Sequence, residues 1–309
     1  MSATLAVTDP VLLGFAEEVG SVDPVAVAGG RTRWELGGPL ADGTRTITAP
    51  TGIVAYAPEE MTVTVRAGTS VDELHAALAV HDQRTSLPER GGTVGGAVVV
   101  GENPLDALGR GRVRDHVLQV RYVSAEGRPV TGGGPTVKNV TGFDLPRLMV
   151  GSLGTLGLVA EVILRTNPTP ATSCWFVAPD ASPRDTYRAL LAPSAVLWDG
   201  SSTWVHLEGH EPDVRAQRTA LGPVGTFTET DGPPALPPHR WSLTPAELSR
   251  LDEAVTGTFV AALGLGLVFA TEPQPPRPLD AGAAEVARRV KQNFDPTGRL
   301  NPGRDPARR

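Results

Sequence analysis

The chain has 309 residues, of which 20% are charged and 40% are hydrophobic, and its formal net charge is −6 at pH 7. This length allows one large domain or two modest ones with a buried core, and the acidic balance argues against a nucleic-acid binder, which needs a basic surface. The single cysteine, Cys174, excludes an internal disulfide framework, suits a reducing compartment and is too few for an iron–sulfur cluster, which usually needs several thiolates.

The sequence gives no sign of a targeting or membrane-spanning segment. Residues 1–20 lack a basic start and a long apolar core, so we do not expect a secretory signal. No apolar run approaches the roughly 20 residues that a membrane helix requires, and the best candidate, 259–270, is more typical of a buried strand or helix. We therefore expect a cytoplasmic protein without direct membrane insertion, which could associate with a membrane only through a partner.

Hydrophobic periodicity and capping residues predict an α+β fold. Ser70 and Glu73 form a capping box that starts a helix, and Val63 and Val65 alternate with threonines as in a half-buried strand. Strands mixed with single helices and glycine-rich loops, without a regular βαβ repeat, are typical of this class. In chain order the expected elements are a helix at 10–20, strands at 25–28, 53–56 and 61–66, a helix from 71 to about 81, strands at 117–123, 158–164, 175–177 and 204–207, and helices at 211–221 and 281–293.

Two proline-rich stretches lie in the second half of the chain. Both of them, 231–238 and 273–278, are followed by periodic segments, so we interpret them as extended loops rather than disordered tails. The last helix follows the second stretch, and its spacing places Val286, Val290 and Phe294 on one stripe.

The first candidate binding loop is Gly29-Gly-Arg-Thr32, which directly follows a predicted strand. Successive backbone amide groups in such a turn can form an anion-binding concavity, to which Arg31 or Arg33 could add charge and Thr32 a hydroxyl group. The loop lacks the Gly-x-Gly-x-x-Gly dinucleotide pattern. Taken alone, it could equally be a glycine turn that binds nothing.

Two further glycine-rich stretches strengthen the case for a ligand. In 87–96, two glycine pairs flank Thr93 and Val94, and a flat aromatic ring could lie against that backbone; a tight crossing of packed elements is the alternative. The stretch 138–157 contains four glycines and runs into the strand at 158–164. Glycine lets the backbone approach a bound group closely, so the three loops together favour a flavin dinucleotide held mainly by backbone.

The order of these motifs resembles the vanillyl-alcohol-oxidase family of FAD-binding flavoenzymes, and within it the FAD-binding subunits of bacterial glycolate oxidases. The resemblance is good over 20–168 and 281–304 and thin over 171–280. It rests on Gly29-Gly-Arg-Thr32, Thr93-Val-Gly-Gly96, Val113-Arg-Asp115, Lys138-Asn-Val-Thr-Gly-Phe-Asp144, Gly151-Ser-Leu-Gly-Thr-Leu-Gly157 and Phe294-Asp-Pro-Thr-Gly-Arg-Leu-Asn-Pro-Gly303.

The resemblance implies two α+β subdomains that hold FAD, a PCMH-type domain, with a small α+β cap. Residues 1–170 would form the FAD-binding domain, 171–280 a shortened cap, and 281–309 a C-terminal helix and tail returning to the FAD domain. The implied FAD-binding residues are Gly29, Gly30, Arg31, Thr32, Arg33, Glu89, Gly92, Thr93, Val94, Gly95, Gly96, Arg114, Asp115, Gly151, Ser152, Gly154, Thr155, Gly157, Leu158, Val159 and Asn301, with Arg304 nearby.

The attachment of the flavin and the absence of a metal are further expectations. Relatives with covalent flavin place a His or Cys in these loops, whereas this chain has neither there, so we predict non-covalent FAD. The spacing of His206 and His210 would suit a metal on a helix, but Gly209 and the strand-like 203–207 argue against one. We therefore predict no metal site, with the two histidines at the surface or in the core.

The function implied by the resemblance is that of an FAD-binding subunit in a glycolate or 2-hydroxy acid oxidase complex, relaying electrons between a catalytic flavoprotein and an iron–sulfur partner. A stand-alone FAD-dependent oxidoreductase acting on a small hydroxy acid or alcohol is the alternative. The catalytic candidates are weak. Arg240 could grip a carboxylate beside Trp241 or simply lie on the surface, and Asn301 and Lys138 could reach the flavin.

Overall fold

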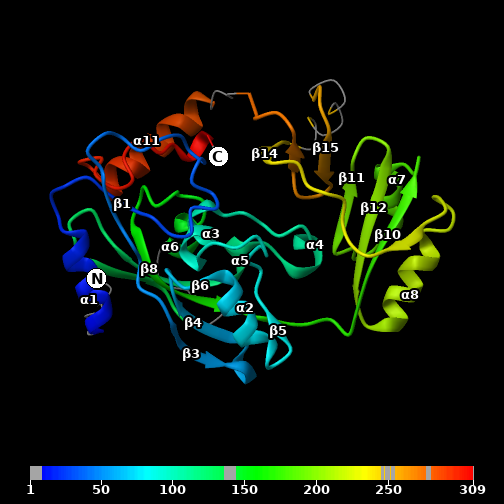
Figure 1. Cartoon of the computed structure of the whole chain (residues 1–309), viewed down its shortest axis with the longest axis horizontal. Helices are drawn as coiled ribbons and strands as arrows, with labels where there is room; N and C mark the ends of the chain where they lie inside the picture. Colours follow the sequence, from blue (N-terminus) through cyan, green and yellow to red (C-terminus); the bar gives the residue numbers. More distant parts are fainter. Residues whose placement is uncertain are drawn as a thin grey trace. The chain divides into compact units, whose positions relative to one another are not determined.

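The computed structural model describes residues 9–135, 144–244, 247, 251, 255–275 and 280–308. The chain divides into two compact units. Unit 1 comprises Met1–Pro104, Arg112–Pro168 and Arg277–Arg309, and unit 2 comprises Leu105–Gly111 and Thr169–Pro276. Each unit has its own sheet and helices, so the predicted α+β class is confirmed (Figure 1).

The core of unit 1 is built on a five-stranded antiparallel sheet in the order β3-β4-β8-β6-β7. Its central strand β8 is buried along nearly its whole length. The elements of this unit are α1 Pro10–Val19, β1 Val25–Val27, β2 Arg45–Ile47, β3 Ile53–Ala57, η1 Pro58–Glu60, β4 Thr62–Arg66, α2 Val71–Ala79, β5 Gln83–Arg84, α3 Val94–Val100, α5 Val113–His116, β6 Val117–Val123, β7 Pro129–Gly133, α6 Leu145–Met149, β8 Leu158–Arg165, β9 Asn167–Pro168, α11 Ala281–Phe294 and η2 Pro306–Arg308.

Residues 299 and 300 contact several separate segments of unit 1. Leu300 bridges Val25 beside the parallel pair β1–β2, and Arg299, only 3% exposed, donates hydrogen bonds to the carbonyl oxygens of Val19 at 2.7 Å and Ala125 at 3.1 Å. Burial lowers the pKa of the Arg299 guanidinium. A buried guanidinium is tolerated only when its donors are satisfied, so this residue fastens separate stretches of unit 1 together.

Helix α11 also packs against this unit, but along a narrower stripe than predicted. Val290 and Phe294 contact the core of unit 1, whereas Val286 is 62% exposed. Lys291, on the same helix, donates a hydrogen bond from Nζ to the Thr155 carbonyl at 2.8 Å. The stripe therefore begins one turn later than the sequence spacing indicated.

A row of charged residues crosses the sheet of unit 1 under α1. Arg66, Glu161 and Arg121 are register partners on β4, β8 and β6, and both arginines pair with Glu161, at 2.7 and 2.8 Å. Arg66 also bonds to Asp9, which caps α1 by accepting from Val11 N at 2.9 Å. This bond to Arg66 lowers the pKa of Asp9, and it ties the helix to the sheet.

Unit 2 is a seven-stranded antiparallel sheet in the order β13-β10-β12-β11-β15-β16-β14. The segment 259–270 is the β15–β16 hairpin, which resolves the strand-or-helix alternative. The elements are α4 Ala107–Arg110, β10 Thr172–Pro179, α7 Pro183–Ala189, β11 Ala195–Trp198, β12 Ser202–Gly209, α8 Glu211–Ala220, β13 Thr228–Thr230, β14 His239–Ser242, β15 Phe259–Ala262 and β16 Leu267–Ala270.

The two faces of this sheet bury different clusters. Val205 and Leu207 of β12 pack with Val214 of α8 on one face. The other face buries Leu197 and Phe269, with Leu105 packed against them. The segment Leu105–Gly111, which the sequence placed in the first domain, therefore groups with unit 2.

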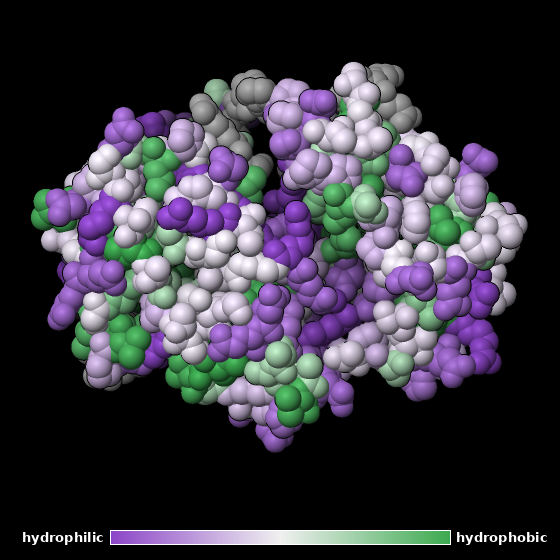
Figure 2. Space-filling model, viewed as in Figure 1, coloured by the Kyte–Doolittle hydropathy of each residue, from purple (hydrophilic) through white to green (hydrophobic). Residues whose placement is uncertain are grey.

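No helix among the described residues is long and apolar enough to cross a bilayer. On the face of the molecule drawn in Figure 2, hydrophobic residues form small patches that alternate with hydrophilic ones.

Candidate functional site

A cavity of about 440 Å³ lies within unit 1, in the size range of roughly 300–1,000 Å³ that small-molecule sites occupy. All three glycine-rich stretches predicted from the sequence contribute to its walls, together with the C-terminal segment. The predicted residues that line it are Gly29, Gly30, Arg31, Thr32, Arg33, Thr93, Gly95, Gly96, Gly154, Leu158, Val159 and Asn301, with Arg304.

The other predicted FAD-binding residues do not line this cavity. Several of them shape the loops that do: Gly92, at φ +85, would place a Cβ 2.5 Å from Thr32 Oγ1, and Gly157 would place one 2.3 Å from Tyr122. Arg114 and Asp115 lie on α5, where Asp115 pairs with Arg147 at 2.8 Å. The remaining members of this group are Glu89, Val94, Gly151, Ser152 and Thr155.

The catalytic candidates have different outcomes. Asn301 lines the cavity, whereas Arg240 lies on β14 of unit 2 and is not one of its lining residues. The neighbouring Trp241 is 4% exposed and donates to the Glu272 carbonyl at 2.7 Å, so this tryptophan is a core residue. Lys138 lies outside the described residues.

The structure adds lining residues that the sequence interpretation missed. Trp34 follows the first loop directly, and Val99 and Val100 come from α3, a helix that was not predicted because Gly95 and Gly96 are poor helix formers. The other additions come mainly from the segments before α2: Val27, Ala28, Leu36, Thr48, Ala49, Thr51, Ala67, Gly68 and Leu153. Gly68 was the available signal, because it stands two residues after the end of β4 and a Cβ there would lie 2.1 Å from the Ala49 carbonyl oxygen.

The first loop presents unused backbone donors to the cavity. Within the described part of the chain, Ala28 N bonds to Ile47 O and Trp34 N to Arg31 O, while the N–H groups of Gly29 to Arg33 make no hydrogen bond to the protein. Arg31 adopts a left-handed conformation at φ 54. Successive amide donors in such a turn are suited to the oxygens of an anionic group.

Two arginine side chains, those of Arg31 and Arg304, belong to the same cavity wall as these donors. The guanidinium groups of Arg31 and Arg304 lie 5.1 and 4.7 Å from the ring centre of Trp34, a geometry that favours cation–π attraction. Arg304 also donates to the carbonyl oxygens of Leu36, at 2.9 Å, and Gly38. Burial lowers the pKa of Arg304, but an arginine side chain stays protonated in proteins. This end of the cavity is therefore positively charged.

Glu102 connects the first two loops. It is 3% exposed and pairs with Arg33 from the first loop and, at 2.7 Å, with Arg90 from the second. Arg33 also donates to the Gly91 carbonyl at 3.0 Å. The carboxylate thus holds the wall formed by Gly29 to Arg33 against the stretch that leads into α3.

The third loop and the C-terminal segment meet at Gly154. This glycine has φ +68, and a Cβ there would lie 2.2 Å from Asn301 Nδ2. The Asn301 amide donates to the Leu153 carbonyl at 2.9 Å, and Asn301 itself adopts φ 44. The close approach requires glycine at 154, so Asn301 holds this turn in place beside the cavity.

Comparison with known proteins agrees with this geometry. Residues 20–133 match the family model described as FAD binding domain. The chain is 33% identical over 209 residues to glycolate oxidase subunit GlcE of Escherichia coli, covering 64% of this chain and 60% of that protein. It is also 36% identical over 106 residues to a D-lactate dehydrogenase of Archaeoglobus fulgidus, covering 33% of this chain and 24% of that enzyme.

Solved structures show the same fold at low sequence identity. An alkyldihydroxyacetonephosphate synthase matches with a TM-score of 0.66 at 13% identity, over 94% of this chain and 74% of that one. A BBE-like protein of Physcomitrella patens matches with a TM-score of 0.65 at 14% identity, over 95% and 87%. The predicted fold and cofactor are thereby confirmed: residues 20–133 carry an FAD binding domain, FAD is the cofactor, and the chain resembles FAD-dependent oxidoreductases and glycolate oxidase subunits.

Proposed function

We propose that the chain is the FAD-binding subunit of an oxidase or dehydrogenase complex that acts on glycolate or a related 2-hydroxy acid. The observation that supports this most directly is the unit 1 cavity, with its run of unused amide donors between arginines. The similarity to GlcE adds the substrate class. A matching 80-residue segment of Bacillus subtilis glycolate oxidase subunit GlcD, at 42% identity, fits a complex of related subunits.

The residues of the cavity suit FAD. The N–H groups of Gly29 to Arg33 and the charge of Arg31 and Arg304 would hold the pyrophosphate. Gly95 and Gly96 would let the backbone lie close to a flat ring, because neither has a side chain. Their own N–H groups already bond to Ala67 O at 2.7 Å and Thr93 Oγ1 at 3.2 Å, so they are not available as donors to the ligand. When bound, FAD supplies hydride and single-electron chemistry, and the protein supplies binding and orientation.

The proposal includes two partners, a catalytic flavoprotein that oxidises the hydroxy acid and an iron–sulfur protein that accepts electrons. Both are implied by the sequence resemblance, and the lone cysteine, which cannot build a cluster, also supports the iron–sulfur partner. Anaerobic addition of glycolate or D-lactate to the isolated chain should leave the flavin absorbance unchanged, and reduction should follow once the flavoprotein partner is added. Bleaching of the isolated chain would instead establish a stand-alone oxidoreductase.

FAD is expected to be bound without a covalent link. No histidine or cysteine is found among the described residues that line the cavity, and Cys174 belongs to unit 2. Acid precipitation of the purified holoprotein should release all of the yellow colour into the supernatant. Flavin fluorescence that remains in the washed pellet would contradict the prediction.

Replacing Glu102 with glutamine should weaken FAD binding. The change keeps the shape of the side chain but removes the charge that holds Arg33 and Arg90, and hydrogen bonds to charged groups contribute roughly 1.5–3 kcal/mol. We expect FAD affinity to fall roughly tenfold, measured by fluorescence titration of the apoprotein. Glu126→Gln is the control, because Glu126 lies outside the cavity with a side chain 55% exposed; equal losses in both variants would disprove the role of Glu102.

A further inference from the structure

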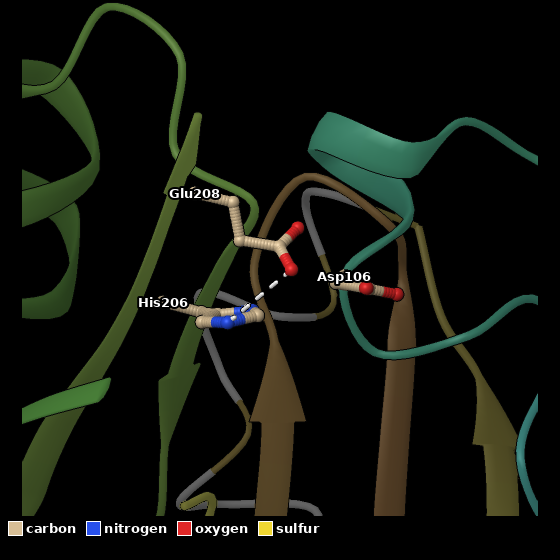
Figure 3. A group of neighbouring side chains, drawn as sticks. All are labelled: Asp106, His206 and Glu208. Atoms are coloured by element: carbon tan, nitrogen blue, oxygen red, sulfur yellow. Dashed lines mark ion pairs between the residues drawn. The ribbon is translucent and has the colours of Figure 1, made fainter. Parts of the chain in front are cut away.

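Unit 2 contains a compact cluster of metal-ligating side chains. Asp106, His206 and Glu208 each offer one ligand atom, and these atoms all lie within 4.8 Å of one another. His206 and Glu208 extend from β12, and Asp106 comes from a separate segment beside them (Figure 3). All three side chains are buried to a similar degree, with exposures of 6–8%.

Strand geometry brings two of the ligands together. His206 and His210 would share a face only on a helix. The predicted strand at 204–207 is part of β12, which spans Ser202–Gly209. In a strand the residues that share a face are two apart, so His206 pairs with Glu208. Their Nε2 and Oε1 atoms are 3.6 Å apart, close to the spacing of about 3.4 Å between ligand atoms around a tetrahedral zinc ion.

The imidazole is held in position by its neighbours. Trp175 stacks on it with 4.4 Å between ring centres and 4° between planes. Ser173 Oγ lies 2.9 Å from Nε2, and this hydroxyl would give up its contact with Nε2 to a bound metal. Both residues come from β10, the strand next to β12. Because the ring is already held in one orientation, it would lose little conformational entropy on binding a metal.

Asp106 reaches the same face of the sheet because its segment is anchored there. Leu105 packs with Leu197 and Phe269, and Gly109 lies so close to Ser194 that a Cβ would be 2.5 Å from its Oγ. Arg110 pairs with Asp106 Oδ2 at 2.7 Å. A carboxylate has two oxygens with about four acceptor sites, so this ion pair and a metal can share Asp106.

We propose that Asp106, His206 and Glu208 bind a divalent transition-metal ion, with Zn²⁺ as the best match, and that the ion fastens the segment Leu105–Gly111 to β12. One imidazole nitrogen and two carboxylate oxygens are a donor set for zinc, whereas Mg²⁺ prefers oxygen ligands alone. Three protein ligands leave a fourth position for water. The site lies wholly in unit 2 and does not depend on the proposed FAD function.

The test starts from the full-length holoprotein after treatment with a chelator. Titration with ZnCl₂ in a calorimeter should show about one ion bound per chain, and MgCl₂ should show none. Zn²⁺ should also raise the melting temperature, because an ion that binds only the folded state stabilises it. Cobalt substitution should give visible absorption bands that report nitrogen and oxygen ligands.

Variants separate this site from other zinc-binding groups. His206→Gln and Glu208→Gln should each weaken Zn²⁺ binding at least tenfold and abolish the shift in melting temperature. His210→Gln is the matched control, since His210 is exposed and follows the end of β12. This variant should bind Zn²⁺ like the unchanged protein. FAD content should stay the same in all three. The absence of zinc binding in the unchanged protein, or binding that survives both His206→Gln and Glu208→Gln, would overturn the proposal.

Discussion

Replacing Glu161 with alanine should lower the free energy of unfolding by about 3–5 kcal/mol, the loss expected when one partner is removed from a buried ion pair. Glu161 is fully buried and neutralises Arg66 and Arg121 at 2.7 and 2.8 Å. Without it, Asp9 is the remaining anionic partner of Arg66 among the residues that the structure describes. Urea unfolding followed by circular dichroism measures the change.

The matched control is Glu126→Ala, at an exposed ion pair with Arg128. Exposed pairs contribute roughly 0–1 kcal/mol, so this variant should differ little from the unchanged protein. If Glu161→Ala were no more destabilising than Glu126→Ala, the charged row would have no structural role. Burial raises the pKa of Glu161 despite its two arginines. A raised folded-state pKa favours the protonated acid, so this group's contribution to stability diminishes as the pH rises above about 4.5.

Replacing Gly29 with valine should abolish retention of FAD through purification. A Cβ at this position would lie 2.5 Å from Thr93 Oγ1, so the first loop must move away from the start of α3. The displacement would open the wall of the cavity and misdirect the N–H groups of Gly29 to Arg33. We expect at least a hundredfold weaker FAD binding, about 2.7 kcal/mol, measured by the ratio of flavin to protein absorbance and by titration of the apoprotein.

Gly232→Val controls for a general effect of adding a branched side chain. No heavy atom lies within 4 Å of the Cβ position at Gly232 and the residue has no positive φ, so FAD content should be unchanged. Unfolding should be measured for both variants. A Gly29→Val protein that is folded and still yellow would show that the first loop does not hold the cofactor.

Local sequence signals predicted much of unit 1. The capping box at Ser70 gave α2 its start, and the structure shows Ser70 accepting from Glu73 N at 3.0 Å. The alternation in 61–66 and the apolar run in 158–164 gave β4 and β8. These elements are determined by side-chain periodicity within one segment, which is information that a sequence contains directly.

Features that depend on contacts between distant segments could not be predicted in the same way. Helix α3 forms in spite of Gly95 and Gly96 because Gly95 packs against Ala67, a contact that intrinsic propensity does not contain. Asp106 and His206 lie close together although residues 112–168, which separate them in the sequence, belong to unit 1. The i, i+2 spacing of His206 and Glu208 is visible in the sequence, but the nearness of Asp106 is not, because it comes from a distant segment.

The fastening of unit 1 by Arg299 and Leu300 affects how the protein is made. These residues hold together the regions around Val19, Val25 and Ala125, yet they are synthesised after every strand of the two large sheets. A nascent chain therefore contains the three glycine-rich loops before it contains Asn301 and Arg304, which complete the lining of the cavity.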